Sequence, residues 1–266
     1  MSEKTGSADL CNNADALTEK SIRAHLERQD IRILALKETD STNSEAKRDD
    51  GCGILLVTAD SQSAGRGRLG RSFYSPADTG LYMTLALPGK SIAFDPVRLT
   101  CAASAAVCRV LERTAGVSPE IKWVNDLLLG GKKICGILCE SVFDGSSSVP
   151  ERIIIGIGIN INTRSFPSGL PAAASICKNI PRAFLAANIT DELLKTAEGK
   201  KEWLEFYRSR SAVIGKNIVY YKGGEAFTAF AEGIDEDGGL IVRGENGDIS
   251  VLRTGEITVR LCQPIP

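Results

Sequence analysis

The sequence of 266 residues contains a single histidine, His25, close to its N-terminus. It has eight cysteines, but they form no CxxC pair and lack the spacing of a disulfide-rich domain. These absences argue against a Cys/His zinc site and against a nucleophile activated by histidine, so we expect no metal site of the protein's own. We interpret the cysteines as reduced and mostly buried, which favours a cytoplasmic protein.

Features that would point to other partners are also missing. No signal-type segment follows Met1, and no apolar run is long enough to span a bilayer. Lysine and arginine together number 32, and aspartate and glutamate number 33. The chain therefore has no overall basic field of the kind that binds DNA or a membrane surface.

The chain is too long for one minimal domain, and changes in its pattern divide it. We expect a polar leader with one short helix over residues 1–30, a large domain of helices and strands over 31–214, and a small β-barrel over 215–266. In the last segment short β patterns alternate with glycine-rich turns. Asn246-Gly247 there predicts a hairpin with a type I′ turn.

Within the large domain, one helix is marked at both ends. A proline opens Pro96–Ala115, an apolar stripe runs along it, and Gly116 follows it. The other predicted elements are the strands Ile31–Leu36, Gly53–Ala59, Leu81–Leu87, Glu120–Trp123, Lys133–Val142 and Arg152–Ile161, a turn at Gly130-Gly131, and a helix over Asp191–Tyr207 interrupted at Gly199.

The most informative stretch is Gly65–Arg71, with three arginines and three glycines in seven residues. It has no apolar face to bury. Its glycines let the backbone approach a ligand closely, and its guanidinium groups can bind two oxygens of a carboxylate or phosphate. A solvated basic turn has the same composition, so the prediction depends on the segments around it. With them, the loop predicts a site that binds an anion and activates it.

Four segments accompany this arginine loop: Asp40–Asn43 before it, and Lys122–Asp126, Lys132–Leu138 and Gly156–Asn160 after it. They supply an STN element, a KWxND element, a KxxGIL strand and a GxGIN strand, and the loop itself reads GRGRxGR. In this order and near this spacing, the five segments resemble the biotin–protein ligase family over roughly residues 31–260. Five ordered elements are far more specific than any one of them.

The resemblance implies an α+β fold of the class II synthetase and biotin–lipoate ligase type. In this fold a mixed, mostly antiparallel sheet is backed by helices, and a small C-terminal β-barrel follows. It implies that residues 31–214 bind biotin and ATP and that the enzyme is an AMP-forming biotin–[acetyl-CoA-carboxylase] ligase. Its substrates would be biotin and ATP, the latter with Mg²⁺. Biotinyl-adenylate would form with release of pyrophosphate, and biotin would then pass to a lysine of a biotin carboxyl carrier domain.

The resemblance also bears on partners. The residues before Ile31 are too few for the DNA-binding helix-turn-helix of bifunctional members, so we expect the monofunctional type. We further expect no sequence-specific DNA binding, no membrane partner, and a monomer or homodimer.

Matching motif to motif implies roles for individual residues. The catalytic residues would be Lys133, Arg66 and Arg68. The biotin-binding residues would be Ser41, Thr42, Asn43, Gln62, Arg66, Gly67, Arg68, Lys133 and Gly136. The ATP-binding residues would be Arg68, Arg71, Phe73, Lys122, Asn125, Asp126, Asn160, Glu256 and Arg260. The glycines of the GxGIN strand would leave room for a ligand to lie flat on the sheet.

These residue types suit the reaction, because the carboxylate of biotin is already a nucleophile and needs positive charge rather than a base. Two positions depart from the family pattern. Val124 stands where proline is usual, which questions the rigidity of that turn. Phe73 stands where tryptophan is frequent, although either ring could cover an adenine.

Several alternatives stay open. Ser41–Asn43 could cap a helix, Lys132 is expected to be a solvated turn residue, and Glu256 and Arg260 could be surface charges on a terminal strand. A lipoate or octanoate ligase or transferase of the same fold is a second function, although such relatives typically lack the GRGRxGR and KWxND pair. A non-catalytic biotin- or nucleotide-binding protein is a third, although binding biotin alone would not need three loop arginines.

Overall fold

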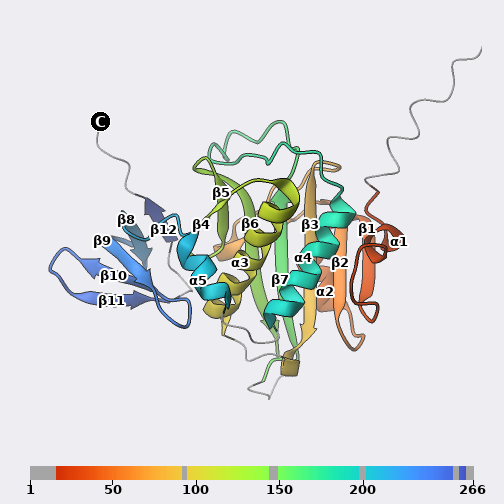
Figure 1. Cartoon of the computed structure of the whole chain (residues 1–266), viewed down its shortest axis with the longest axis horizontal. Coiled ribbons are helices and arrows are strands. Elements are labelled where there is room, and N and C mark those ends of the chain that lie inside the picture. Colours follow the sequence, from red (N-terminus) through yellow and green to blue (C-terminus); the bar gives the residue numbers. More distant parts are fainter. Residues whose placement is uncertain (1–15, 92–94, 144–148, 198–201, 254–257, 262–266) are drawn as a thin grey trace, which may run out of the picture.

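A seven-stranded sheet forms the centre of the protein, as a computed structural model of residues 16–91, 95–143, 149–197, 202–253 and the backbone of 258–261 shows (Figure 1). Its strand order is β1-β2-β3-β7-β6-β5-β4. The pair β1–β2 is parallel, and every other neighbouring pair is antiparallel. The strands are β1 (Arg32–Thr39), β2 (Leu55–Gln62), β3 (Gly80–Pro88), β4 (Glu120–Lys122), β5 (Asp126–Leu129), β6 (Lys132–Val142) and β7 (Arg152–Asn160).

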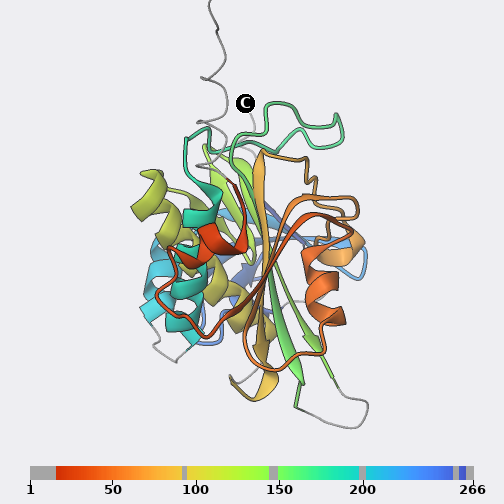
Figure 2. The same ribbon diagram turned by 90° about the vertical axis from the view of Figure 1, so that its right-hand side faces the viewer.

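Helices cover both faces of this sheet. The helices are α1 (Glu19–Arg23), α2 (Thr42–Arg48), α3 (Pro96–Ala115), α4 (Arg182–Ala197) and α5 (Glu202–Ser209), and short 3₁₀ turns span Arg68–Gly70 and Gly89–Ser91. Figure 2 shows α3, α4 and α5 on one face and α2 on the other. The main core lies under the three larger helices, and a small separate cluster around Ala46 lies under α2. This arrangement confirms the α+β fold with a mixed, mostly antiparallel sheet.

The boundaries of α3 are those that its sequence signals predict. Asp95 caps the helix by accepting a hydrogen bond from the backbone N–H of Arg98 at 2.8 Å, and Pro96 occupies the first turn. Gly116 ends it in a left-handed conformation with φ of 61°. Within the described residues, no helix is both long and apolar enough to cross a membrane.

Two elements differ from the prediction. Strand β5 was not predicted, because a short leucine run after the KWxND element has no alternating pattern; the turn at Gly130-Gly131 joins it to β6. Helix α4 begins at Arg182, well before the predicted Asp191. The buried residues of α4 include the polar side chains of Arg182 and Thr190, which hides the amphipathic period.

The C-terminal residues form a second, five-stranded antiparallel sheet in the order β11-β10-β9-β8-β12. Its strands are β8 (Asn217–Lys222), β9 (Glu225–Ile234), β10 (Leu240–Gly244), β11 (Ile249–Leu252) and β12 (Thr258–Leu261). The pairings between described strands do not join β11 to β12, so closure into a barrel stays a prediction.

The predicted hairpin at Asn246-Gly247 is present between β10 and β11, but its turn is not type I′. Gly247 has φ of 88°, whereas Asn246 is not among the residues with positive φ. The backbone N–H of Gly247 bonds to the carbonyl of Gly244 at 3.0 Å, and that of Gly244 bonds to Asp248 at 2.9 Å. This is a three-residue loop built on a type I turn with glycine in the left-handed position.

A buried arginine fastens the end of α2 to the sheet. Arg152 of β7 donates to the carbonyl oxygens of Ala46 at 2.9 Å, Asp49 at 2.8 Å and Gly51. It also pairs with the Asp49 carboxylate at 2.9 Å, while Arg32 binds that carboxylate from the solvent side. The Arg32 hydrogen bond, and then that of Arg152, lower the pKa of Asp49 to about 2 against the effect of burial.

We therefore expect Arg152→Met to lower the free energy of unfolding by about 3 kcal/mol, because it leaves three carbonyls without their donor and removes the buried partner of the Asp49 carboxylate. Arg32→Met removes the exposed partner of the same carboxylate and should cost less than about 1 kcal/mol. Because the pKa of Asp49 is lowered, its contribution is present above the ordinary pKa of about 3.9 and is lost as the pH falls towards 2. Urea denaturation of both variants checks this, and equal losses would contradict it.

Candidate active site

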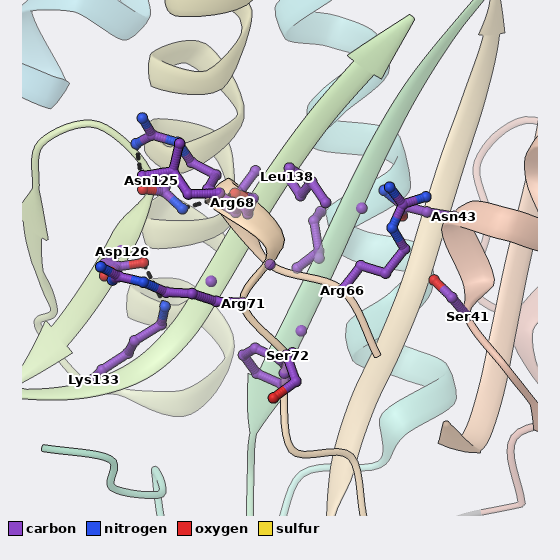
Figure 3. Close-up of a pocket in the computed structure, with 18 of the residues that line it drawn as sticks. Ser41, Asn43, Arg66, Arg68, Arg71, Ser72, Asn125, Asp126, Lys133 and Leu138 are labelled. Atoms are coloured by element: carbon purple, nitrogen blue, oxygen red, sulfur yellow. Dashed lines mark hydrogen bonds and ion pairs between the residues drawn. The ribbon is translucent and has the colours of Figure 1, made fainter. Parts of the chain in front are cut away.

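A cavity of about 650 Å³ lies on the face of the large sheet that also carries α2. The arginine loop, the end of β2, the segment after β4 and the middle of β6 and β7 surround it (Figure 3). Among the residues that line it are all those predicted to bind biotin: Ser41, Thr42, Asn43, Gln62, Arg66, Gly67, Arg68, Lys133 and Gly136. Of those predicted to bind ATP, the ones that line it are Arg68, Arg71, Phe73, Lys122, Asn125 and Asp126.

The arginine loop forms a narrow arch over this cavity. The backbone N–H of Phe73 bonds to the carbonyl of Gly65 at 2.8 Å, and that of Gly67 bonds to Arg71 at 2.7 Å. Gly65 is required at the base of the arch, because a Cβ there would lie 2.5 Å from the carbonyl oxygen of Phe73. In Figure 3 Arg66 extends towards Asn43, whereas Arg68 lies against Asn125. The arch thus sends its guanidinium groups to the two ends of the cavity.

The end of the cavity beside α2 presents neutral hydrogen-bonding groups. Ser41, Thr42 and Asn43 are all at most 5% exposed. Ser41 occupies the N-cap position of α2, yet its side chain makes no capping hydrogen bond. Gln62 accepts from the backbone N–H of Thr42 at 2.9 Å and donates to Ser75 at 2.8 Å. Capping therefore does not account for the hydroxyl of Ser41.

The opposite end is charged. Lys133 Nζ lies 2.6 Å from Asp126 Oδ1, and Arg68 donates to Asn125 Oδ1 at 3.1 Å. Asn125 in turn donates to the carbonyl of Ile137 at 2.9 Å, which fixes its amide. Burial lowers the pKa of the Arg68 guanidinium, and the nearby Asp126 carboxylate opposes that shift.

A β-bulge in β6 turns Lys133 into the cavity. Leu128 pairs with Lys133 and Leu127 pairs with Cys135, so Ile134 is an extra residue on β6. Side chains alternate along a regular strand, and the bulge shifts that alternation by one. Lys133 consequently lines the same cavity as Gly136, while Ile134 and Cys135 are both fully buried.

Gly156 and Gly158 of β7 both line the cavity, and side chains of the protein also lie close to each of them. A Cβ on Gly156 would run into the amide of Asn43, and one on Gly158 would lie 2.5 Å from the ring of Phe73. The room at these two glycines is thus shared between the cavity and two side chains of the protein. Phe73 also makes an edge-to-face contact with Tyr82, with ring centroids 6.3 Å apart.

Three predicted ATP-binding residues are not brought to the cavity by the described structure. Asn160 is 4% exposed, does not line the cavity, and donates to the carbonyl of Ala174 at 3.1 Å. Glu256 lies outside the described residues. Arg260 belongs to β12, where its backbone pairs with Val219, and its side chain is outside the described part.

Sequence reasoning missed Glu140, which links helix α2 to the arginine loop. Its carboxylate accepts from Asn43 Nδ2 at 2.8 Å and from Lys47 Nζ at 2.7 Å, and it lies 3.3 Å from Arg66 Nη2. Thr84 donates to the other atom of the Asn43 amide at 2.7 Å. Burial would raise the pKa of Glu140, but the bonds from Lys47 and Asn43 lower it below its ordinary value. The signal was available, since Glu140 is the one acid in the apolar run 134–142.

The cavity has neutral polar groups beside α2, cations on the arch and at the far end, and no histidine in its lining. The described residues hold no metal-ligating cluster. This arrangement suits one class of protein. It suits an enzyme that joins a carboxylate to a nucleotide phosphate.

Comparisons with known proteins agree with this class. Residues 36–160 match the Biotin/lipoate A/B protein ligase family, and residues 213–260 match the Biotin protein ligase C terminal domain. The chain is 32% identical to the Bifunctional ligase/repressor BirA of Bacillus spizizenii, over 84% of this chain and 70% of that protein. It is also 32% identical to the Biotin--[acetyl-CoA-carboxylase] ligase of Paracoccus denitrificans, over 80% of this chain and 94% of that protein.

Among solved structures, the chain is similar to the biotin protein ligase from Aquifex aeolicus in complex with biotin and ATP. The TM-score is 0.74 at 28% sequence identity, over 87% of this chain and 99% of the other. The chain belongs to the biotin protein ligase family. The resemblance read from the five sequence motifs is confirmed.

We expect Glu140→Gln to weaken biotin binding by about tenfold, because the amide loses the charge that holds Lys47 and Arg66 and no longer fixes the Asn43 amide. Glu151→Gln is the matched control, since Glu151 is exposed and immediately precedes the neighbouring strand β7. Calorimetric titration with biotin measures both. Unchanged affinity in Glu140→Gln, with an unchanged Tm, would remove Glu140 from the site.

Proposed function

We propose that the cavity holds biotin and ATP end to end, with the carboxylate of biotin at the charged half. As a biotin protein ligase, the protein activates biotin with ATP and transfers it to another protein. The single observation that carries the placement is the polarity of the cavity. Ser41, Thr42, Asn43 and Gln62 match the neutral ureido ring, whereas Lys133 and Arg68 at the other end match the two anions that must meet.

The chemistry explains why cations and not a base gather at the reacting end. A carboxylate oxygen of biotin attacks the α-phosphorus of ATP, the bond to the bridging oxygen breaks, and pyrophosphate leaves. Two unit charges of like sign at 4 Å repel by about 4 kcal/mol at an effective dielectric constant of 20. Lys133 and Arg68 stand where that repulsion, and the charge of the transition state, would be offset.

ATP enters as its magnesium complex in this proposal. The described residues hold no cluster of three or more metal-ligating side chains, and the cavity presents one carboxylate, Asp126. Magnesium that is held mainly by substrate phosphates needs no more than one or two protein carboxylates. The nucleotide would lie against Arg68, Arg71, Phe73, Lys122, Asn125 and Asp126, and Glu256, Arg260 and Asn160 stay predictions for the same role.

In the second step an acceptor amine attacks the carbonyl carbon of the adenylate, loses its proton, and AMP leaves. We propose that the amine is a lysine of the biotin carboxyl carrier domain of a biotin-dependent carboxylase. The proposal also includes the division of the chain into 1–30, 31–214 and 215–266. It further includes a cytoplasmic location, a monomeric or homodimeric state, and the lack of sequence-specific DNA binding.

Mass spectrometry of a carrier domain incubated with this protein, biotin and MgATP tests the function. We expect the mass of one biotin on one lysine. Pyrophosphate release without the carrier would separate an enzyme from a non-catalytic binder, and lipoate in place of biotin would separate the two ligase activities. Transfer of lipoate but not of biotin would overturn the proposal, and a sequence-dependent shift of a promoter fragment at physiological salt would overturn its DNA clause.

Lys133 and Lys132 provide a matched pair. Lys133 lines the cavity, whereas Lys132 is exposed at the start of β6. Lys133→Ala should slow adenylate formation at least about a hundredfold, since its charge acts on the transition state, and Lys132→Ala should leave it within about twofold. Single-turnover release of pyrophosphate measures both, and equal effects would show that the wrong lysine has been assigned.

Arg66 provides a separate test of the arch. We expect the arch to keep water from the mixed anhydride once it has formed, because it lies directly over the cavity. Arg66→Ala should therefore release biotinyl-adenylate about tenfold faster as well as form it more slowly. Release from the preformed complex is followed in a chase with excess biotin. A release rate equal to that of the parent would limit Arg66 to the first step.

A further inference from the structure

The segment Lys122–Asp126 turns polar side chains to the cavity and is held from behind. Trp123 is 4% exposed, and Val124 is fully buried. The carbonyl oxygen of Val124 accepts hydrogen bonds from Ser104 Oγ of α3 at 3.2 Å and from Tyr207 Oη of α5 at 3.3 Å. Two helices of the large core thus fix the backbone of the segment.

A third support comes from the C-terminal sheet. The indole Nε1 of Trp123 donates to the carbonyl oxygen of Gly238 at 2.9 Å, and Cys101 Sγ lies 3.6 Å from the same oxygen. Gly238 belongs to the turn Asp235–Gly239, which joins β9 to β10. The carboxylate of Asp235 closes this turn by accepting from two backbone N–H groups within it, at 3.0 Å and 2.8 Å. The turn is therefore a rigid contact between the two sheets.

The chain requires glycine at this contact for two separable reasons. Gly238 has φ of +84°, and a Cβ on it would lie 2.9 Å from Cys101 Sγ and 3.4 Å from Val97 Cγ1. Gly247, in the next turn of the same sheet, has φ of +88°, but a Cβ there would meet nothing within 4 Å. The two positions share the backbone strain that a side chain would bring, and only Gly238 touches the core.

We infer that the turn Asp235–Gly239 is a positioning device for the nucleotide half of the active site. By holding the indole of Trp123 it sets the place of Asn125 and Asp126, which line the cavity two and three residues further along the chain. A buried N–H that loses its acceptor must find another, so the segment that carries it must shift. The C-terminal sheet thus affects ATP binding through the segment Lys122–Asp126, which belongs to the large sheet. The inference rests on the proposed nucleotide role of Lys122–Asp126.

The test compares Gly238→Ala with Gly247→Ala in pyrophosphate release without an acceptor. We expect Gly238→Ala to raise the KM for ATP by about tenfold and to leave the KM for biotin within about twofold, which a general loss of structure would not do. Gly247→Ala should change neither constant. Equal constants in the two variants, or an equal rise for biotin and ATP, would overturn the inference.

Trp123→Phe decides the matter if Gly238→Ala does not fold, since it keeps a six-membered aromatic ring and removes the five-membered ring that carries the N–H. It should raise the KM for ATP selectively, by about fivefold, and an unchanged value would overturn the inference.

Binding of MgATP can also be measured without turnover, because the chain has two tryptophans and Trp203→Phe leaves Trp123 as the sole fluorescent reporter. The MgATP concentration that gives half of the fluorescence change should be about tenfold higher in Trp203→Phe with Gly238→Ala than in Trp203→Phe alone. A parent protein that forms no adenylate would refute the proposed function instead.

Discussion

The concentration of positive charge around one cavity is the constraint on which the rest of the site depends. Arg66, Arg68 and Lys133 face the same space, and cations so close would repel one another without counter-charges. Two carboxylates supply them. Glu140 holds Arg66 together with Lys47 at one end, and Asp126 holds Lys133 at 2.6 Å at the other. The free protein can therefore keep its cations in place before either substrate arrives.

The sheet brings these groups together by departing from regularity. Strand β6 carries both Lys133 and Glu140, and their odd separation would place them on opposite faces without the bulge at Ile134. On neighbouring β7, glycine at 156 and 158 lets Asn43 and Phe73 lie directly on the backbone. Because β7 has no side chain at Gly156 or Gly158, the side chains of Asn43 and Phe73 can line the cavity directly above the sheet.

Motif order predicted the family and most of the cavity lining, because the Gly65–Arg71 loop and its companion segments are local signals. Apolar and alternating patterns predicted most of the strands. The bulge and the role of Glu140 could not be found in the same way. Both depend on pairing between strands distant in sequence, which a one-dimensional pattern does not record. Helix α4 was misplaced for a related reason, since buried Arg182 is paired with Asp60, a partner far along the chain. Asn160 stays a prediction, because its motif position does not coincide with a place in the cavity lining.

The two carboxylates also bear on how substrates enter. Each one already occupies an anion position beside a cation, so a substrate carboxylate or phosphate that reaches Lys133 or Arg66 replaces one anion by another. The cation then keeps an anionic partner throughout. The displaced Asp126 stays in the cavity wall beside the KWxND segment, whose backbone is fixed from behind. Its charge there opposes a second anion at the same point, which agrees with the proposal that ATP enters as its magnesium complex.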